Sequence, residues 1–185
     1  PGLSRAGRTG RRAAVRSAAD GRRAVCGVLD GPVLLVGAAV GLLVTNILYT
    51  HSVLDRHADS RMGKRTLAHL LGTPRAMIAA SGLFCFAPFV LVAAGAGCGM
   101  LPAAALATFV LLPMAAFLWR SLRSYVLDRP VALRTAPWMG PMGDFKRYSD
   151  MGIGWFMLRW LLARNLVSFF ALILLVVYTV LEIME

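Results

Sequence analysis

The chain has 185 residues, of which 58% are hydrophobic and only 16% are charged, and its mean hydropathy is +0.66. Because the apolar residues are gathered in long blocks and not spread with helical period, we predict an all-α, polytopic membrane helical bundle with about four transmembrane helices in a lipid bilayer. The net charge of +11 does not indicate nucleic-acid binding, since the basic residues lie at the N-terminus and between apolar blocks, where membrane topology accounts for them.

Residues 1–30 are a basic segment with almost no bulky apolar side chain. Its arginines stand among glycine, alanine and serine: Arg5, Arg8, Arg11, Arg12, Arg16, Arg22 and Arg23. We expect a disordered or surface-lying arm, or a stretch foreign to the fold, with a transit peptide as the competing interpretation because such peptides are also rich in Arg and poor in acids. The transmembrane domain is expected at residues 31–185.

Four apolar segments are long enough to approach or cross the hydrocarbon layer, which takes about 20 helical residues. They cover residues 32–50, 76–97, 101–119 and 154–183. Only the short uncharged turn at 98–100 joins the second segment to the third, so these two are expected to form a membrane hairpin. Pro113 predicts a kink inside the third helix.

The connections 51–75 and 120–153 contain five and six Lys or Arg residues, whereas the turn 98–100 contains none. The positive-inside rule therefore predicts that both long connections are cytoplasmic. Four spans would then leave the arginine-rich segment 1–30 on the opposite side, which is the wrong side for such a segment. Since the chain also begins with Pro1, we expect a truncated N-terminus from which earlier spans have been lost.

The connection 120–153 and the start of the last helix carry side chains typical of a membrane boundary. Four aromatic residues are expected to act as interfacial anchors: Trp138, Phe145, Tyr148 and Trp155. Arg159 is a candidate to extend toward the interface. Arg164 lies deeper and is a candidate to face a polar cavity, where it would suit an anionic substrate.

The segment between the first two spans is the place where paired acids and clustered bases meet. In a helix, Asp55 and Asp59 at i and i+4 share one face with Cβ atoms about 5–6 Å apart, so the two negative charges call for a cation between them. Oxygen ligands with room for water suit Mg²⁺, which is held by one or two carboxylates together with substrate phosphates. A candidate anion-binding segment follows, which combines a flexible glycine, two cations and a hydroxyl: Gly63, Lys64, Arg65 and Thr66.

Further polar residues lie close to this segment. Asn46 and Tyr49, near the end of the first span, are candidates either to line the same cavity or to hydrogen-bond a neighbouring helix. His51 and His57 flank the aspartates and are expected to be polar loop residues, because an oxygen site for Mg²⁺ does not need imidazole.

This constellation resembles the second aspartate-rich motif of the intramembrane aromatic prenyltransferases, the UbiA superfamily. The resemblance is carried by Asn46-Ile-Leu-Tyr49, by Asp55-x3-Asp59-x3-Gly63-Lys64-Arg65-Thr66-Leu67-Ala68, and by Leu71-Gly72. The aspartates followed by Gly-Lys-Arg-Thr-Leu-Ala are most similar to the 1,4-dihydroxy-2-naphthoate prenyltransferases of menaquinone synthesis.

The resemblance implies a bundle of nine membrane helices around a cavity, of which this chain would supply the C-terminal part. Two aspartate-rich motifs would hold Mg²⁺ on the diphosphate of a polyprenyl donor, and an aromatic acceptor would attack the allylic carbon. Asp55 and Asp59 would be the metal ligands, and Lys64 and Arg65 would neutralise the leaving diphosphate. A bacterial inner membrane is implied, with the Asp55 loop in the cytoplasm.

The sequence departs from this family pattern in two places. The first aspartate-rich motif is missing, and residues 1–30 offer only Asp20 and Asp30 in a basic context, so the chain alone is expected to be inactive. Just before the first aspartate, the naphthoate enzymes carry asparagine where this chain has the run 49–52 (Tyr-Thr-His-Ser). Therefore 4-hydroxybenzoate or another aromatic ring stays open as the acceptor.

Two other classes of membrane protein also place acidic residues next to apolar spans. A CDP-alcohol phosphotransferase is rejected, because Val25 stands where its signature requires Arg and the later Gly and Asp positions are also occupied by apolar residues. A membrane transporter or lipid-binding fragment without enzymatic activity stays open; it predicts no Mg²⁺ dependence and tolerance of Asp55→Asn.

Overall fold

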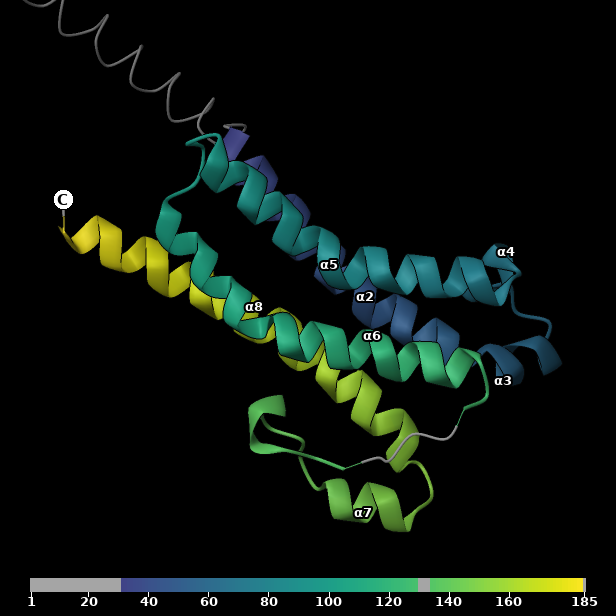
Figure 1. Cartoon of the computed structure of the whole chain (residues 1–185). Helices are drawn as coiled ribbons and strands as arrows, with labels where there is room; N and C mark the ends of the chain where they lie inside the picture. The colour runs from purple at the N-terminus through teal and green to yellow at the C-terminus, as the bar shows by residue number, and fades with distance from the viewer. Residues whose placement is uncertain (1–30, 130–133, 185) are drawn as a thin grey trace, which may run out of the picture.

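The computed structural model of the chain describes residues 31–129 and 134–184, and the predicted arm at 1–30 lies outside the described residues. Within those ranges the chain is entirely helical (Figure 1). Its elements in order are α2 (Gly31–Leu54), α3 (Arg56–Arg61), α4 (Leu67–Leu71), α5 (Pro74–Gly97), the 3₁₀ helix η2 (Ala103–Leu111), α6 (Leu112–Val126), the 3₁₀ turn η3 (Pro137–Met139), α7 (Phe145–Asp150) and α8 (Gly154–Met184).

Four helical segments are long and apolar enough to cross a membrane, which confirms the predicted all-α membrane architecture. They are α2, α5, the combined η2 and α6, and α8. Two helices run beyond their predicted ends: α2 continues past Thr50 to Leu54, and α6 continues past Trp119 to Val126. Backbone hydrogen bonding continues into polar sequence without interruption, whereas hydropathy detects only where the apolar run stops.

The third span changes helix type at its middle. η2 ends at Leu111, α6 begins at Leu112, and Pro113 lies in the first turn of α6. Proline suits this position because the first N–H groups of an α-helix have no partner within the helix. The kink that was predicted inside one helix is thus a junction between a 3₁₀ and an α segment.

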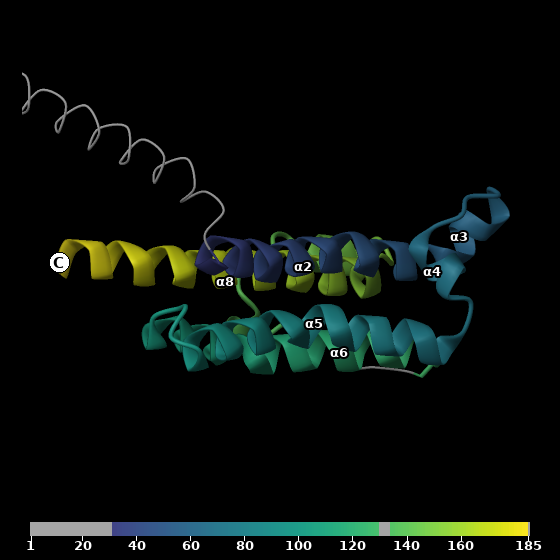
Figure 2. The same cartoon turned by 90° about the horizontal axis from the view of Figure 1, so that it is seen from above.

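The four spans pack in two layers, with α2 and α8 in one and α5 and α6 in the other (Figure 2). α2 contacts both α5 and α8, while α8 also packs against η2 and α6. At the centre of the bundle, the Phe89 ring meets the rings of Phe109 and Phe170 edge to face, with centroids 5.7 and 5.5 Å apart. One ring from α5 therefore joins η2 and α8 through the geometry that aromatic pairs prefer.

Both long connections leave the bundle at the same end, as the loop charges predicted, and the second then folds back beside α8 (Figure 1), where Trp138 meets Phe117 of α6. Tyr125, near the end of α6, donates a hydrogen bond of 2.8 Å to the carbonyl of Leu54 at the end of α2. The Tyr125 ring also stacks on Trp155 of α8, with 5.4 Å between centroids and 9° between ring planes. The ends of three spans are thereby fixed together where the Asp55 segment begins.

At the opposite end, Gly95 is a close-packed position in α5. A Cβ atom there would lie 2.8 Å from Leu101 Cγ and 3.1 Å from Leu35 Cδ2. Because Leu101 is buried, it cannot swing away, and we expect Gly95→Ala to lower the free energy of unfolding by about 1–3 kcal/mol. Unfolding in detergent, followed by circular dichroism, measures this change.

The matched control is Gly41→Ala in α2, where an added Cβ meets nothing within 4 Å. It should unfold no earlier than the wild type, because alanine favours a helix over glycine. Equal loss of stability in both variants would contradict the packing assigned to Gly95.

Candidate functional site

The two aspartates lie where helical hydrogen bonding passes from α2 into α3. The Asp55 N–H donates to the His51 carbonyl at 3.0 Å, and the Asp59 N–H donates to the Asp55 carbonyl at 2.8 Å. Asp55 itself has φ −90° and ψ 0°, so the chain bends there without losing this i to i+4 bonding. The carboxylates consequently stand one helical turn apart, as their spacing predicted.

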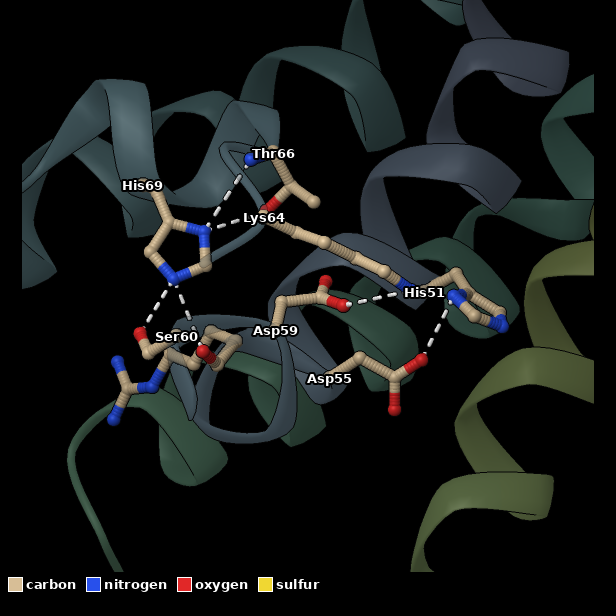
Figure 3. Close-up of polar contacts among 8 residues, drawn as sticks. His51, Asp55, Asp59, Ser60, Lys64, Thr66 and His69 are labelled. Atoms are coloured by element: carbon tan, nitrogen blue, oxygen red, sulfur yellow. Dashed lines mark hydrogen bonds and ion pairs between the residues drawn. The ribbon is translucent and has the colours of Figure 1, made fainter. Parts of the chain in front are cut away.

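Each carboxylate faces a basic side chain (Figure 3). His51 Nδ1 lies 3.1 Å from Asp55 Oδ2, and Lys64 Nζ lies 4.0 Å from Asp59 Oδ1. The side chain of Asp55 is 33% exposed and that of Asp59 is 15% exposed, so both remain in reach of solvent. The site therefore pairs two partly shielded carboxylates with a histidine and a lysine at its rim.

His51 is a correction to the sequence interpretation, which assigned it to a loop. It lies in the last turn of α2, and its ring also meets Phe156 of α8 edge to face at 5.3 Å. Helical spacing alone brings His51 and Asp55 together, since residues four apart are neighbours on a helix surface. The extent of α2 was the missing information, because the apolar run stops before His51.

The loop between α3 and α4 folds back over α3. Gly63 has φ +69°, a left-handed conformation that favours glycine, and the Lys64 N–H returns to the Asp59 carbonyl at 2.9 Å. This turn brings Lys64 toward Asp59, although the two are five positions apart in the sequence. An open pocket of about 590 Å³ lies against this loop; its lining residues are Ser60, Gly63, Lys64, Arg65, His69 and Leu70.

His69 is a residue of this site that the sequence analysis missed. It stands three positions after Thr66, the N-cap of α4, and both of its ring nitrogens contact polar groups of the hairpin formed by α3 and α4 (Figure 3). The available signal was its spacing, because Thr66-x-x-His69 has the positions of a capping box with His in place of Glu.

Asn46 and Tyr49 are buried between α2 and α5, nine and six positions before Asp55. The Asn46 amide contacts Cys85 Sγ at 3.6 Å, and the Tyr49 hydroxyl donates to the Met77 carbonyl at 2.7 Å. This is the helix-to-helix role that was considered for both residues. Their role in substrate binding stays a prediction.

The two arginines of α8 are both held by hydrogen bonds to other parts of the chain. Arg159 is 4% exposed, and it donates to the carbonyls of Trp155 and Ser121 at 2.6 and 3.3 Å. Arg164 donates at 3.0 Å to the Pro141 carbonyl and thereby holds the loop before α7. Arg164 also donates to Oδ1 of its neighbour Asn165 at 2.9 and 3.2 Å. The bonds to Ser121 and Pro141 join distant segments, which the sequence does not reveal.

The donor set fits Mg²⁺ held jointly with an anionic ligand. Among residues 31–129 and 134–184, no three His, Cys, Asp or Glu side chains converge on one point, so these residues do not form a closed protein cage for a metal. Two carboxylates one turn apart match the usual Mg²⁺ site, in which substrate phosphates and waters complete the octahedron. Lys64, which approaches Asp59, and Arg65, which follows it in the loop and lines the same pocket, suit the negative charge of such a ligand.

Comparison with protein families matches residues 18–139 to the UbiA prenyltransferase family. This match covers more than half of the chain and includes α2 to η3, and with them the Asp55 segment. No curated protein and no solved structure matches the chain.

The position of Tyr49 leads to a stability prediction. Tyr49→Phe removes one buried hydrogen bond but leaves the Met77 carbonyl with a second donor, the Ser81 hydroxyl at 2.9 Å. We expect the free energy of unfolding to fall by about 1 kcal/mol, measured by unfolding in detergent. The control is Tyr178→Phe, at a 38% exposed position of α8. Its free energy of unfolding should stay within about 0.5 kcal/mol of the wild-type value.

Proposed function

The chain belongs to the UbiA prenyltransferase family, and from this premise we propose that it is a membrane enzyme that transfers a polyprenyl group from a polyprenyl diphosphate to an aromatic acceptor. The observation that carries the proposal is the pair Asp55 and Asp59, held one turn apart at the end of a membrane span and facing Lys64. An acidic pair with an adjacent cation suits a metal diphosphate, which presents both kinds of charge.

Asp55 and Asp59 are proposed as the ligands of Mg²⁺. The backbone bonding through Asp55 keeps the carboxylates on one side of the helix, so little rearrangement is needed when the metal diphosphate enters. When bound, Mg²⁺ supplies Lewis-acid stabilisation of the negative charge that develops on the leaving diphosphate. His51 contacts Asp55 Oδ2 and so limits the orientations of that carboxylate.

Lys64 and Arg65 are proposed to bind the diphosphate oxygens. The 4.0 Å between Lys64 Nζ and Asp59 Oδ1 is too long for a hydrogen bond, so the ammonium keeps its donors for an incoming anion. The 60% exposed Lys64 side chain can turn toward that anion without leaving a buried charge unpaired. Both cations lie in the loop between α3 and α4, outside the apolar bundle. The prenyl tail would lie between the helices of that bundle.

The proposed acceptor is 1,4-dihydroxy-2-naphthoate, which would place the enzyme in menaquinone biosynthesis. Support comes from the Gly-Lys-Arg-Thr-Leu-Ala run that begins at Gly63. In the reaction, the allylic C–O bond breaks and diphosphate leaves with the bonding electrons, while a ring carbon of the acceptor forms the new C–C bond. The ring regains aromaticity by losing the group on that carbon, which is a proton passed to water or, at the carboxyl-bearing carbon of the naphthoate, CO2. We also propose that the Asp55 end faces the cytoplasm of a bacterial inner membrane, since the two Lys- and Arg-rich connections share that end.

Removing either carboxylate should abolish the reaction. We expect Asp55→Asn and Asp59→Asn each to lower Mg²⁺-dependent transfer by about 100-fold or more, because the amide keeps the shape of the side chain but loses the charge that holds the metal. The assay uses the full-length protein in membranes with radiolabelled polyprenyl diphosphate. Asp150→Asn, an exposed position in α7, is the matched control and should retain activity.

Lys64 should contribute to binding of the prenyl donor. We expect Lys64→Ala to raise the KM for polyprenyl diphosphate by about tenfold, a loss of about 1.4 kcal/mol typical of one charged contact.

A panel of acceptors identifies the aromatic ring. Transfer is compared for 1,4-dihydroxy-2-naphthoate, 4-hydroxybenzoate and other phenols. Preference for 4-hydroxybenzoate would overturn the proposed acceptor. No transfer to any ring, together with an Asp55→Asn variant that behaves as the wild type with and without Mg²⁺, would favour a non-enzymatic membrane protein.

A further inference from the structure

The hairpin formed by α3 and α4 carries the proposed diphosphate contacts, yet little apolar packing holds it. α3 has no buried residue, and α4 buries only Ala68. The bundle itself is secured by rings and aliphatic side chains, whereas this hairpin projects beyond it (Figure 2). Polar contacts must therefore define how α4 sits against α3.

His69 makes most of these contacts. Its Nδ1 lies 2.8 Å from Thr66 Oγ1 and 3.4 Å from the Thr66 backbone nitrogen. Its Nε2 lies 3.0 Å from the carbonyl oxygen of Arg56 and 2.7 Å from Ser60 Oγ. One imidazole thus joins the first and fifth residues of α3 and the N-cap of α4.

The bonding pattern defines the tautomer of this ring. A backbone N–H can only donate, so Nδ1 is the acceptor for Thr66; a backbone carbonyl can only accept, so Nε2 carries the proton and donates to Arg56. Both nitrogens are fully used inside the hairpin. His69 therefore has no free nitrogen for a metal or a substrate, and any effect it has on the reaction passes through the residues that it holds.

Those residues are the ones that separate the two halves of the proposed site. Ser60 directly follows Asp59, and Thr66 directly follows Arg65. The hydrogen bonds of His69 to Ser60 and Thr66 therefore limit how far the loop with its two cations can move from Asp59 on α3. Two nearby side-chain contacts tie the hairpin to the bundle without joining α3 to α4. Ser52 Oγ of α2 accepts from the Ala68 N–H of α4 at 3.1 Å, and Arg56 of α3 contacts Met77 Sδ of α5 at 3.9 Å.

We propose that His69 is a positioning residue of the donor site, whose two ring nitrogens hold the Lys64 and Arg65 loop against α3, the helix that carries Asp59. The inference rests on the proposed function, because it takes Asp55 and Asp59 as the metal side and the loop as the anion side. It adds a residue that contacts neither the metal nor the substrate.

The kinetic test compares His69→Leu with His69→Gln in the full-length protein in membranes. His69→Leu loses every polar contact of the ring and should raise the KM for polyprenyl diphosphate by about tenfold, with the KM for the aromatic acceptor unchanged. His69→Gln keeps a donor near the Arg56 carbonyl and should restore the donor KM to within about threefold of wild type. A merely destabilising change would lower the amount of active enzyme and kcat without moving one KM alone.

The matched control is His57→Leu, an exposed histidine of α3 whose Nε2 contacts only the Arg56 side chain, at 3.2 Å. It should leave both KM values within about twofold of wild type, since it does not join α3 to α4. An increase in donor KM equal to that of His69→Leu would overturn the specific role of His69.

A second measurement does not depend on activity. Hydrogen–deuterium exchange in detergent should be faster by about tenfold or more in residues 59–70 of His69→Leu, and unchanged in α5, because the hydrogen bonds of His69 are lost while the bundle remains packed. Calorimetry with inorganic diphosphate and Mg²⁺ should show weaker binding in the same variant. Unchanged exchange and unchanged diphosphate binding would overturn the positioning role.

The two proposals fail in different ways. If the wild type transfers no prenyl group to any acceptor, the proposed function fails, whereas the exchange measurement still decides whether His69 holds the hairpin. If transfer occurs but the donor KM of His69→Leu equals that of the wild type, the function stands and the role of His69 is wrong.

Discussion

The continuous backbone hydrogen bonding from α2 through Asp55 into α3 is the constraint on which the candidate site depends. It carries a membrane span into polar sequence and delivers both carboxylates at its end, one turn apart. Two negative charges at this distance are unfavourable on their own, and the surrounding groups reduce that cost: His51 contacts Asp55 and Lys64 approaches Asp59. A bound cation would remove the remaining repulsion, which is why the family's metal chemistry suits this position.

Two kinds of contact stabilise the two parts of the structure. In the bundle, the ring of Phe89 meets rings from η2 and α8, and close approach at Gly95 lets α5 pack against its neighbours. In the hairpin of α3 and α4, hydrogen bonds to His69 replace apolar burial. A segment held by few hydrogen bonds can adjust to a ligand at low cost, whereas the bundle beneath it keeps the aspartates in place.

Polar groups inside the spans serve the architecture. Asn46 and Tyr49 bind α5, and Arg159 binds backbone carbonyls while its guanidinium lies 5.3 Å from the centre of the Tyr125 ring. Such groups are costly in lipid unless a partner is present, so each defines a specific neighbour for its helix. They join α2 to α5 and α8 to α6, and none of them has to touch a substrate to do so.

The sequence alone determined the four spans and the shared end of the two long connections, because apolar length and loop charge are local properties of the chain. It also indicated the family, because the residues of the Asp55–Ala68 motif are contiguous in the sequence. The spacing of Asp55 and Asp59 was equally readable, since a helix turns local spacing into a shared face. Only the tertiary structure decided that Lys64 returns to Asp59, that His69 joins α3 to α4, and that Arg159 and Arg164 bind carbonyls of other segments. These contacts depend on how the chain turns at Gly63 and how the helices cross, and no periodicity in the sequence encodes which distant carbonyl a side chain will meet.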